Sequence, residues 1–221
     1  MGEFTFELKE YKEEEVPSGE VAAQTALEFT SKIQTEWTKG KDYPKDGCTV
    51  KTYNTRLGGD FWMARVSRHG DVGFDAFKKG IFENHTENEV EYIPLLDSFK
   101  ILGETGDWRS VLVHYKFPRL FSDREMTVWI AAVQPDPEVK QFVVISLPSD
   151  RPIVEDVTRA YYCSIEVVTY LEDEGCVEWL MAQASDACGN IPRWIQDRSV
   201  TASVVDDVPH FISWAKQKYQ N

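Results

Sequence analysis

The last third of the chain places two long strand-forming runs directly before one long amphipathic segment. Residues 161–171 and 177–184 are rich in β-branched and aromatic side chains, which favour strands. The segment that follows, from residue 191 to about residue 219, carries apolar residues approximately along one side, as an amphipathic helix does. A sheet that ends in such a helix can close around it. This order favours a hollow grip over a packed sandwich of two sheets.

The first third combines one helix with one hairpin. Residues 20–37 contain no helix breaker and are followed by Gly40, so we predict a helix there. Residues 50–57 and 61–67 are strand-like and flank Gly58-Gly59-Asp60, a turn of residues that tolerate positive φ. These two segments predict a β-hairpin.

Helix signals return in the middle of the chain and then give way to strands. Residues 73–85 have phenylalanines and an isoleucine at helical spacing, and a short helix is expected over 89–93 before Pro94. The expected strands after that are residues 98–102, 108–117, 125–133, 141–147, 161–171 and 177–184. With the hairpin this makes about eight strands, and their short connections favour antiparallel pairing. The predicted fold class is α+β.

The length of 221 residues fits one large domain. Residues 1–19 are strongly charged and end in Pro17-Ser18-Gly19, so we expect a flexible leader or edge segment there and a single domain over 20–221. Pro209 interrupts the C-terminal amphipathic pattern. We expect a kink at that residue, or a new helix capped by Asp206 or Asp207 with Pro209 in its first turn.

The net charge of −13 argues against nucleic acid as a partner, because phosphate-backbone binding depends on clustered Lys and Arg. It also argues against simple electrostatic adhesion to anionic lipid. No run approaches the ~20 apolar residues that a membrane-spanning helix needs, and no signal peptide or myristoylation motif is seen at the N-terminus. We therefore expect a soluble, cytoplasmic protein, and leave its oligomeric state open.

Motifs for metals, cofactors and catalysis are lacking in the sequence. Cys48, Cys163, Cys176 and Cys188 are too widely spaced for paired zinc ligands and are expected to be free thiols. The four histidines form no His-x-x-x-His or Glu-x-x-His pattern, and no nucleotide-binding or nucleophile motif occurs. We expect no cofactor and no metal. Catalytic groups assembled from separate strands would leave no such local signature.

Polar residues inside apolar strands are the more specific signal for a site. Strand alternation puts Arg65 on one face with Met63, and Glu166 on one face with Tyr162 and Tyr170. Buried charges are costly unless paired, so if Arg65 and Glu166 both point inward they should meet each other or a ligand head group. Periodicity alone leaves open that these residues face solvent. The candidate ligand-binding residues are Arg65, His114, Tyr115, Tyr162, Glu166, Tyr170, Trp179, Gln183, Trp194 and Phe211.

Two motifs resemble those of the START family of lipid-binding domains. SDREM at residues 122–126 resembles the family's start of a strand at Asp-Arg-Asp, with Glu125 in place of the second Asp. GNIPRWI at residues 189–195 resembles the beginning of the family's closing helix. The resemblance implies a START/Bet v 1-like helix-grip fold, in which a curved antiparallel sheet wraps a long C-terminal helix around a hydrophobic cavity. Trp194, on the inner side of that helix, would border the cavity.

Two further segments resemble a START-like family of largely uncharacterised fungal proteins. They are WMARVSRH at residues 62–69 and NHTENEVEYIP at residues 84–94. In the second, EYIP at 91–94 stands where better-known carriers often have a Trp-Asp pair, so the resemblance implies no particular lipid class. Proteins of the helix-grip superfamily bind sterols, phospholipids, ceramides or plant hormones, and a minority are cyclases or hydrolases.

The leading hypothesis is a protein that binds one lipid or sterol between the sheet and the C-terminal helix. As a further expectation, it transfers this ligand through transient membrane contact. The alternative is a cyclase or hydrolase of a polyketide-like or aromatic metabolite in the same cavity, with Glu166 or His114 as acid or base. A third interpretation is a regulatory module whose partner contact depends on bound ligand. Because no catalytic motif is seen, we favour binding over catalysis.

Overall fold

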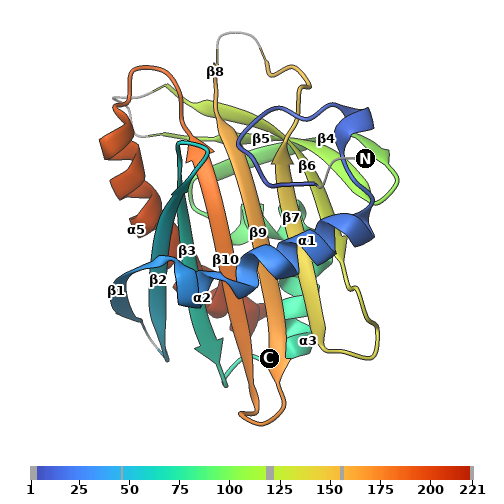
Figure 1. Cartoon of the computed structure of the whole chain (residues 1–221), viewed down its shortest axis with the longest axis vertical. Coiled ribbons are helices and arrows are strands. Elements are labelled where there is room, and N and C mark those ends of the chain that lie inside the picture. Colours follow the sequence, from blue (N-terminus) through green and yellow to red (C-terminus); the bar gives the residue numbers. More distant parts are fainter. Residues whose placement is uncertain (1–3, 46, 118–121, 155–156, 220–221) are drawn as a thin grey trace.

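The computed structural model describes residues 4–45, 47–117, 122–154 and 157–219, so the ends of the expected leader and domain, 1–3 and 220–221, lie outside the described residues. Within this part of the chain ten strands form one sheet, in the order β1-β2-β3-β10-β9-β7-β6-β5-β4, with β8 paired in parallel to β6 (Figure 1). All other neighbours are antiparallel. The strands are β1 Thr38–Lys45, β2 Cys48–Leu57, β3 Asp60–His69, β4 Leu96–Thr105, β5 Trp108–Tyr115, β6 Arg124–Val133, β7 Gln141–Pro148, β8 Thr158–Arg159, β9 Tyr161–Leu171 and β10 Cys176–Asp186.

Helices cover both faces of the sheet, and α1 and α5 lie on opposite faces (Figure 1). The helical elements are η1 Glu13–Glu15, α1 Gly19–Ser31, α2 Ile33–Glu36, α3 Phe74–Phe77, the π-helical turn η2 Lys78–Phe82, α4 His85–Tyr92 and α5 Arg193–Tyr219. Among the described helices, none is both long enough and apolar enough to cross a membrane.

The outer face of the sheet packs against α1 and the N-terminal segment. Three alanines of α1, Ala22, Ala23 and Ala26, are fully buried and let the helix lie close to the strands. Upstream of α1, the Tyr11 N–H donates to the Pro148 carbonyl at 2.8 Å, and Trp129 Nε1 donates to the Tyr11 carbonyl at 3.0 Å. The described part of residues 1–19 therefore contacts the sheet, while the domain limit at residue 20 stays a prediction.

The inner face packs against α3, α4 and α5, and strand alternation separates the two sides. On β3, Trp62, Ala64 and Val66 belong to the outer core, while Arg65 between them faces the inner side. Register fixes what lies beside Arg65, because Met181 of β10 pairs with Arg65 on one side and with Glu166 of β9 on the other. These three side chains form one row across the sheet.

Most predicted elements are present, and three differ. The helix predicted over 73–85 is divided into α3 and the π-turn η2 before α4 begins at His85. Strands β1 and β8 were not predicted, since β1 contains Gly40 and Pro44 and β8 has two residues. The second helix proposed from Pro209 is wrong, because α5 continues through it. Buried Val205, Val208 and Phe211 on both sides of Pro209 offset the one hydrogen bond that proline removes.

A candidate ligand pocket between the sheet and the C-terminal helix

A pocket of about 510 Å³ lies between the inner face of the sheet and α5. Its lining comes from β3, β5, β6, β9 and β10, from the end of α4 with residues 93–95, and from the first half of α5. Apolar and aromatic side chains predominate, among them Ile93, Met126, Trp179, Met181 and Val204. This combination of volume and lining is typical of small-molecule sites.

Arg65 provides a charged group within this lining. Its side chain is 1% exposed, its guanidinium carbon lies 3.7 Å from the centre of the Trp179 ring, and its Nη2 lies 4.0 Å from Glu166 Oε2. Trp179 Nε1 donates to the same Glu166 oxygen at 2.7 Å. Arg65 Nε and Nη1 have no hydrogen-bond partner among the described residues. Because unpaired buried donors are costly, an acceptor on a bound molecule would satisfy them.

Burial also changes the acidity of groups around the pocket. The pKa of Asp207 on α5 is raised to about 7 by burial, with Glu166 and Glu89 adding to the rise and Arg65 opposing it. Burial likewise raises the pKa of Tyr92, Tyr115 and Tyr162 well above its ordinary value. These three phenols stay protonated and can donate hydrogen bonds to a ligand.

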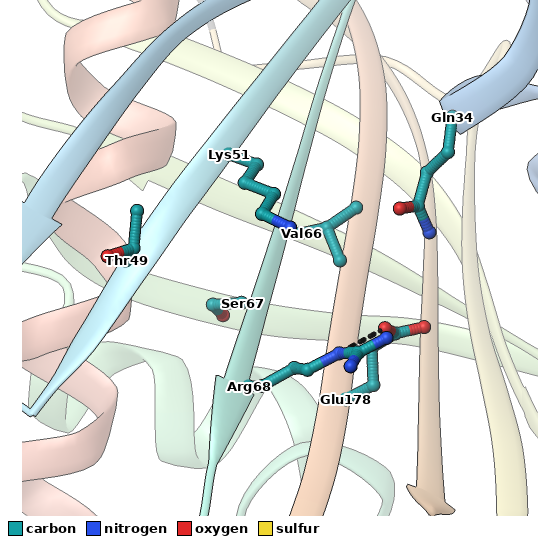
Figure 2. A pocket seen from close by; sticks show the side chains of 7 residues that line it. All are labelled: Gln34, Thr49, Lys51, Val66, Ser67, Arg68 and Glu178. Carbon is teal, nitrogen blue, oxygen red and sulfur yellow. Dashed lines mark hydrogen bonds and ion pairs between the residues drawn. The ribbon is translucent and has the colours of Figure 1, made fainter.

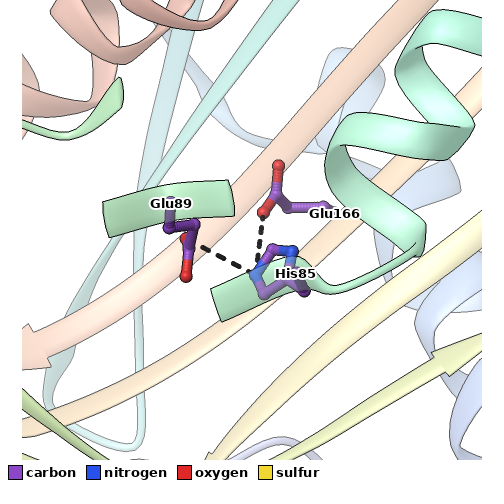
Figure 3. Close-up of side chains that lie close together, drawn as sticks. All are labelled: His85, Glu89 and Glu166. Atoms are coloured by element: carbon purple, nitrogen blue, oxygen red, sulfur yellow. Dashed lines mark ion pairs between the residues drawn. The ribbon is translucent and has the colours of Figure 1, made fainter. Parts of the chain in front are cut away.

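A second cluster adjoins the pocket: His85 and Glu89 of α4, one turn apart, and Glu166 of β9 (Figure 3). His85 Nε2 lies 3.4 Å from Glu89 Oε1 and 4.0 Å from Glu166 Oε1, and the ring is buried. Burial lowers the pKa of His85, but the neighbouring carboxylates more than compensate, so it is raised overall. Burial raises the pKa of Glu89.

Six of the ten predicted ligand-binding residues line the pocket: Arg65, Tyr115, Tyr162, Glu166, Trp179 and Gln183. The predicted meeting of Arg65 and Glu166 is confirmed as a contact between their side chains. Binding by these residues stays a prediction.

The placement of Trp194 on the inner side of α5 is wrong. Its side chain is 63% exposed, and its neighbours Ile191 and Ile195 line the pocket instead. The amphipathic pattern gives little guidance at this end because Trp194 lies in the first turn of α5 and Ile191 comes before the helix begins.

His114, Tyr170 and Phe211 also lie outside the pocket lining. His114 Nδ1 lies 3.2 Å from Glu125 and its Nε2 3.5 Å from Asp123, since alternation along β5 sends it away from Tyr115. Tyr170 lies near the end of β9 with Lys140 Nζ 4.6 Å from its ring. Phe211 supports the pocket wall from behind, with its ring centre 5.0 Å from that of Trp179. The structure thus does not bring His114 and Glu166 into one catalytic pair.

Several pocket residues were missed by the sequence reasoning. Asp207 was considered only as a helix cap, and Glu89 was not considered. Two signals could have identified them: an acid within the apolar stripe of α5, and the four-residue spacing of His85 and Glu89 on a helix.

A smaller hollow of about 200 Å³ lies away from α5, over β2, β3 and β10 (Figure 2). It is lined by Gln34, Thr49, Lys51, Val66, Ser67, Arg68 and Glu178. Arg68 already donates to Glu178 at 2.9 Å and to Glu174. The other cation of the lining, Lys51, is exposed, so this hollow offers no buried charged group comparable to Arg65.

Comparison with known proteins assigns the chain to a family. Residues 62–215 match the family described as "Protein of unknown function (DUF3074)". The chain belongs to this family. An uncharacterised protein of Schizosaccharomyces pombe, C577.11, is 28% identical over 187 residues, which are 79% of this chain and 76% of that protein.

Solved structures show the same fold at low sequence identity. Human StAR-related lipid transfer protein 5 has a TM-score of 0.74 at 11% identity, over 90% of this chain and 95% of that one. Human STARD10 has a TM-score of 0.73 at 14% identity, over 93% of this chain and 84% of that one. A StAR-related lipid transfer protein fragment from Xanthomonas axonopodis has a TM-score of 0.66 at 14% identity, over 81% of this chain and 98% of that one. The DUF3074 chain thus has the START helix-grip fold, as the sequence motifs predicted.

Proposed function

We propose that this protein binds one lipid or sterol molecule in the pocket between the sheet and α5. The observation that carries the proposal is the pocket itself: about 510 Å³, mostly apolar, with the buried Arg65 guanidinium in its lining. Apolar burial favours binding by roughly 25 cal/mol per Å² before the costs of association. The two unpartnered nitrogens of Arg65, Nε and Nη1, would donate to the polar end of the ligand.

The size of the pocket restricts the ligand. A volume of about 510 Å³ is in the range of small-molecule sites and suits one sterol or one single-chain amphiphile. Names of proteins with this fold, such as StAR-related lipid transfer protein 5, agree with a lipid ligand.

We further propose that the ligand is exchanged with membranes, in the cytoplasm. Leu95 and Ile195 line the pocket yet are 44% and 37% exposed, so apolar side chains reach from the pocket to the surface. Exposed Trp194 directly precedes Ile195 on α5. Aromatic side chains with a polar tip suit the membrane interface, and this edge would touch the bilayer briefly during exchange. The four free thiols fit the reducing cytoplasm.

Native mass spectrometry tests the binding proposal. The purified protein is incubated with a total yeast lipid extract, desalted, and measured intact, and the released molecule is then identified. We expect one adduct of sterol or single-chain lipid mass per protein.

Two tryptophan substitutions on α5 provide the matched comparison. Val200→Trp fills the pocket because Val200 lines it, whereas Ala202→Trp adds the same bulk at an exposed position outside the lining. Val200→Trp should lose the adduct and Ala202→Trp should keep it. Bare wild-type protein after incubation, or equal adducts in both variants, would contradict binding in this pocket.

A further inference from the structure

The cluster of His85, Glu89 and Glu166 contains more ionisable groups than lipid binding requires. Three potential metal-ligand atoms, the His85 imidazole nitrogen and one oxygen from each carboxylate, lie within 4.8 Å of one another (Figure 3). His85 and Glu166 are buried and Glu89 is mostly so. Apolar contacts hold a lipid without such a group, so the cluster needs its own explanation.

The backbone around His85 orients its ring toward the two carboxylates. His85 Nδ1 donates to the Ile81 carbonyl at 2.7 Å, which leaves Nε2 facing Glu89 and Glu166. Ile81 belongs to the π-turn η2, a feature often found at functional sites. A histidine that ligates a metal commonly donates its other ring N–H to a backbone carbonyl in this way.

Asn88 holds the π-turn in place. Its Nδ2 lies within hydrogen-bonding distance of the carbonyls of Lys79, Gly80 and Glu83, at 3.0, 3.1 and 2.8 Å. The orientation of His85 is therefore fixed by groups outside the cluster.

The charges around the cluster leave room for a cation. Glu89, Glu166 and Asp207 line the pocket, and Arg65 is the one permanent cation in the described part of its lining. Arg65 and Trp179 both approach Glu166 Oε2, so Oε1 stays directed at His85.

We propose that His85, Glu89 and Glu166 bind one divalent transition-metal ion of the zinc or manganese type. Imidazole and carboxylate ligands suit these ions. Two ligand atoms that each lie about 2.1 Å from one ion are at most about 4.2 Å apart, and the separations of 3.4 and 4.0 Å from His85 Nε2 satisfy this limit. All three ligand atoms lie within 4.8 Å of one another, so a bound ion would draw them closer together.

The site would be open toward the ligand. Because Glu89 and Glu166 line the pocket, the ion would keep a coordination position on that side. Arg65, which is 99% buried beside Glu166 in the same lining, has two side-chain nitrogens without a partner among the described residues. Together the ion and Arg65 would hold an oxygen-rich anionic group.

Metal binding can be measured without any lipid, so its outcome is separate from that of the proposed function. Untagged protein is stripped with a chelator, dialysed against Zn²⁺ or Mn²⁺, and analysed for retained metal by mass spectrometry and for binding by calorimetry. We expect one ion per chain in wild type, and its loss in His85→Asn and Glu89→Gln. Manganese is included because the four cysteines could bind zinc but bind manganese poorly.

Glu91→Gln is the matched control, since Glu91 is on the same helix but bonds Lys218 and Trp214 outside the cluster. It should retain the ion. If the buried variants misfold, anomalous scattering from wild-type crystals soaked in Mn²⁺ should show a peak between the three side chains. Wild type that retains neither ion, retention unchanged in Glu89→Gln, or NMR spectra of metal-treated protein with both ring nitrogens of His85 protonated would each overturn the proposal.

Discussion

Asp207 is the pocket acid whose protonation most directly links stability to pH. It lies on α5 next to Asp206, and burial raises its pKa to about 7. Its carboxyl group faces a region that also contains Arg65, Glu166 and Glu89, so its charge is felt by each of them. Protonation of this one side chain therefore changes the charge of the pocket near neutral pH.

Asp207→Asn should remove a pH dependence of folding stability. In the folded protein Asp207 keeps its proton up to about pH 7, whereas its ordinary pKa is 3.8. Its stabilising contribution is therefore full below pH 3.8 and is lost as pH rises through about 7. The difference corresponds to at most about 4 kcal/mol, and water in the pocket will reduce it.

The measurement is urea unfolding of ligand-free protein in chelator at several pH values between about 4 and 8. The free energy of unfolding of wild type, relative to Asp207→Asn, should fall across this range. Asp206→Asn is the control, because Asp206 is exposed and pairs with Lys45. Parallel curves for wild type and Asp207→Asn would show that Asp207 titrates normally.

At the residue scale, alternation made Arg65, Glu166, Trp179 and Gln183 candidates for the inner face but left open that they face solvent, and the structure places all four in the pocket lining. The same reasoning misplaced His114 and Trp194. Successive strand residues face opposite sides of the sheet, so an error of one residue moves a side chain to the other face. The first turn of a helix has no preceding turn, so its rotation about the helix axis is not fixed by the pattern. For Glu89 and Asp207 the sequence offers only the spacing from His85 and a place in the apolar stripe of α5, and their position in the pocket depends on how α4 and α5 pack against the sheet.

At the element scale, the π-turn η2 approaches α5 closely at Gly80. A Cβ added at Gly80 would lie 2.6 Å from Phe211 Cε2 and 2.9 Å from Trp214 Cζ3. Phe211 is fully buried and its ring packs against Phe77, Tyr92 and Trp179, so it has no free space to move into. Glycine at residue 80 thus allows the turn that carries Ile81 to reach the helix.

Gly80→Ala should destabilise the protein by about 1–3 kcal/mol, the usual cost of overpacking a close-packed core. Gly70→Ala is the control, because a Cβ there meets nothing within 4 Å. Urea unfolding of both variants measures the difference. A Gly80→Ala protein as stable as wild type would mean that α5 can withdraw from η2 without cost.

Sequence patterns predicted elements well where one face of the element is buried. Strands β9 and β10 have regular patterns, and their predicted ranges agree closely with the observed ones, whereas the single helix predicted over 20–37 is divided into α1 and α2. The π-turn could not be predicted, since its i→i+5 hydrogen bonding is imposed by packing of η2 on α5 rather than by residue propensities. The Gly40 and Pro44 of β1 obscured an edge strand, where such residues are tolerated.

For the whole molecule, one sheet separates two buried regions with different roles. The outer region consists of α1, α2 and the N-terminal segment packed on alternate strand residues. The inner region combines α3, η2, α4 and α5 with the pocket. Surface ion pairs connect α5 to the strands, including Arg56 with Asp197 and Lys45 with Asp206. No described residue of α5 belongs to the outer region.

Ile33→Ala tests whether the two regions act independently. Ile33 of α2 is fully buried in the outer region, so the substitution should cost about 2–5 kcal/mol of stability. Because the pocket lies on the other face, the folded variant should carry the same lipid adduct as wild type in native mass spectra. Urea unfolding measures the first effect. Loss of the adduct at temperatures where the variant is still folded would mean that outer packing sets the curvature of the sheet, and through it the volume of the pocket.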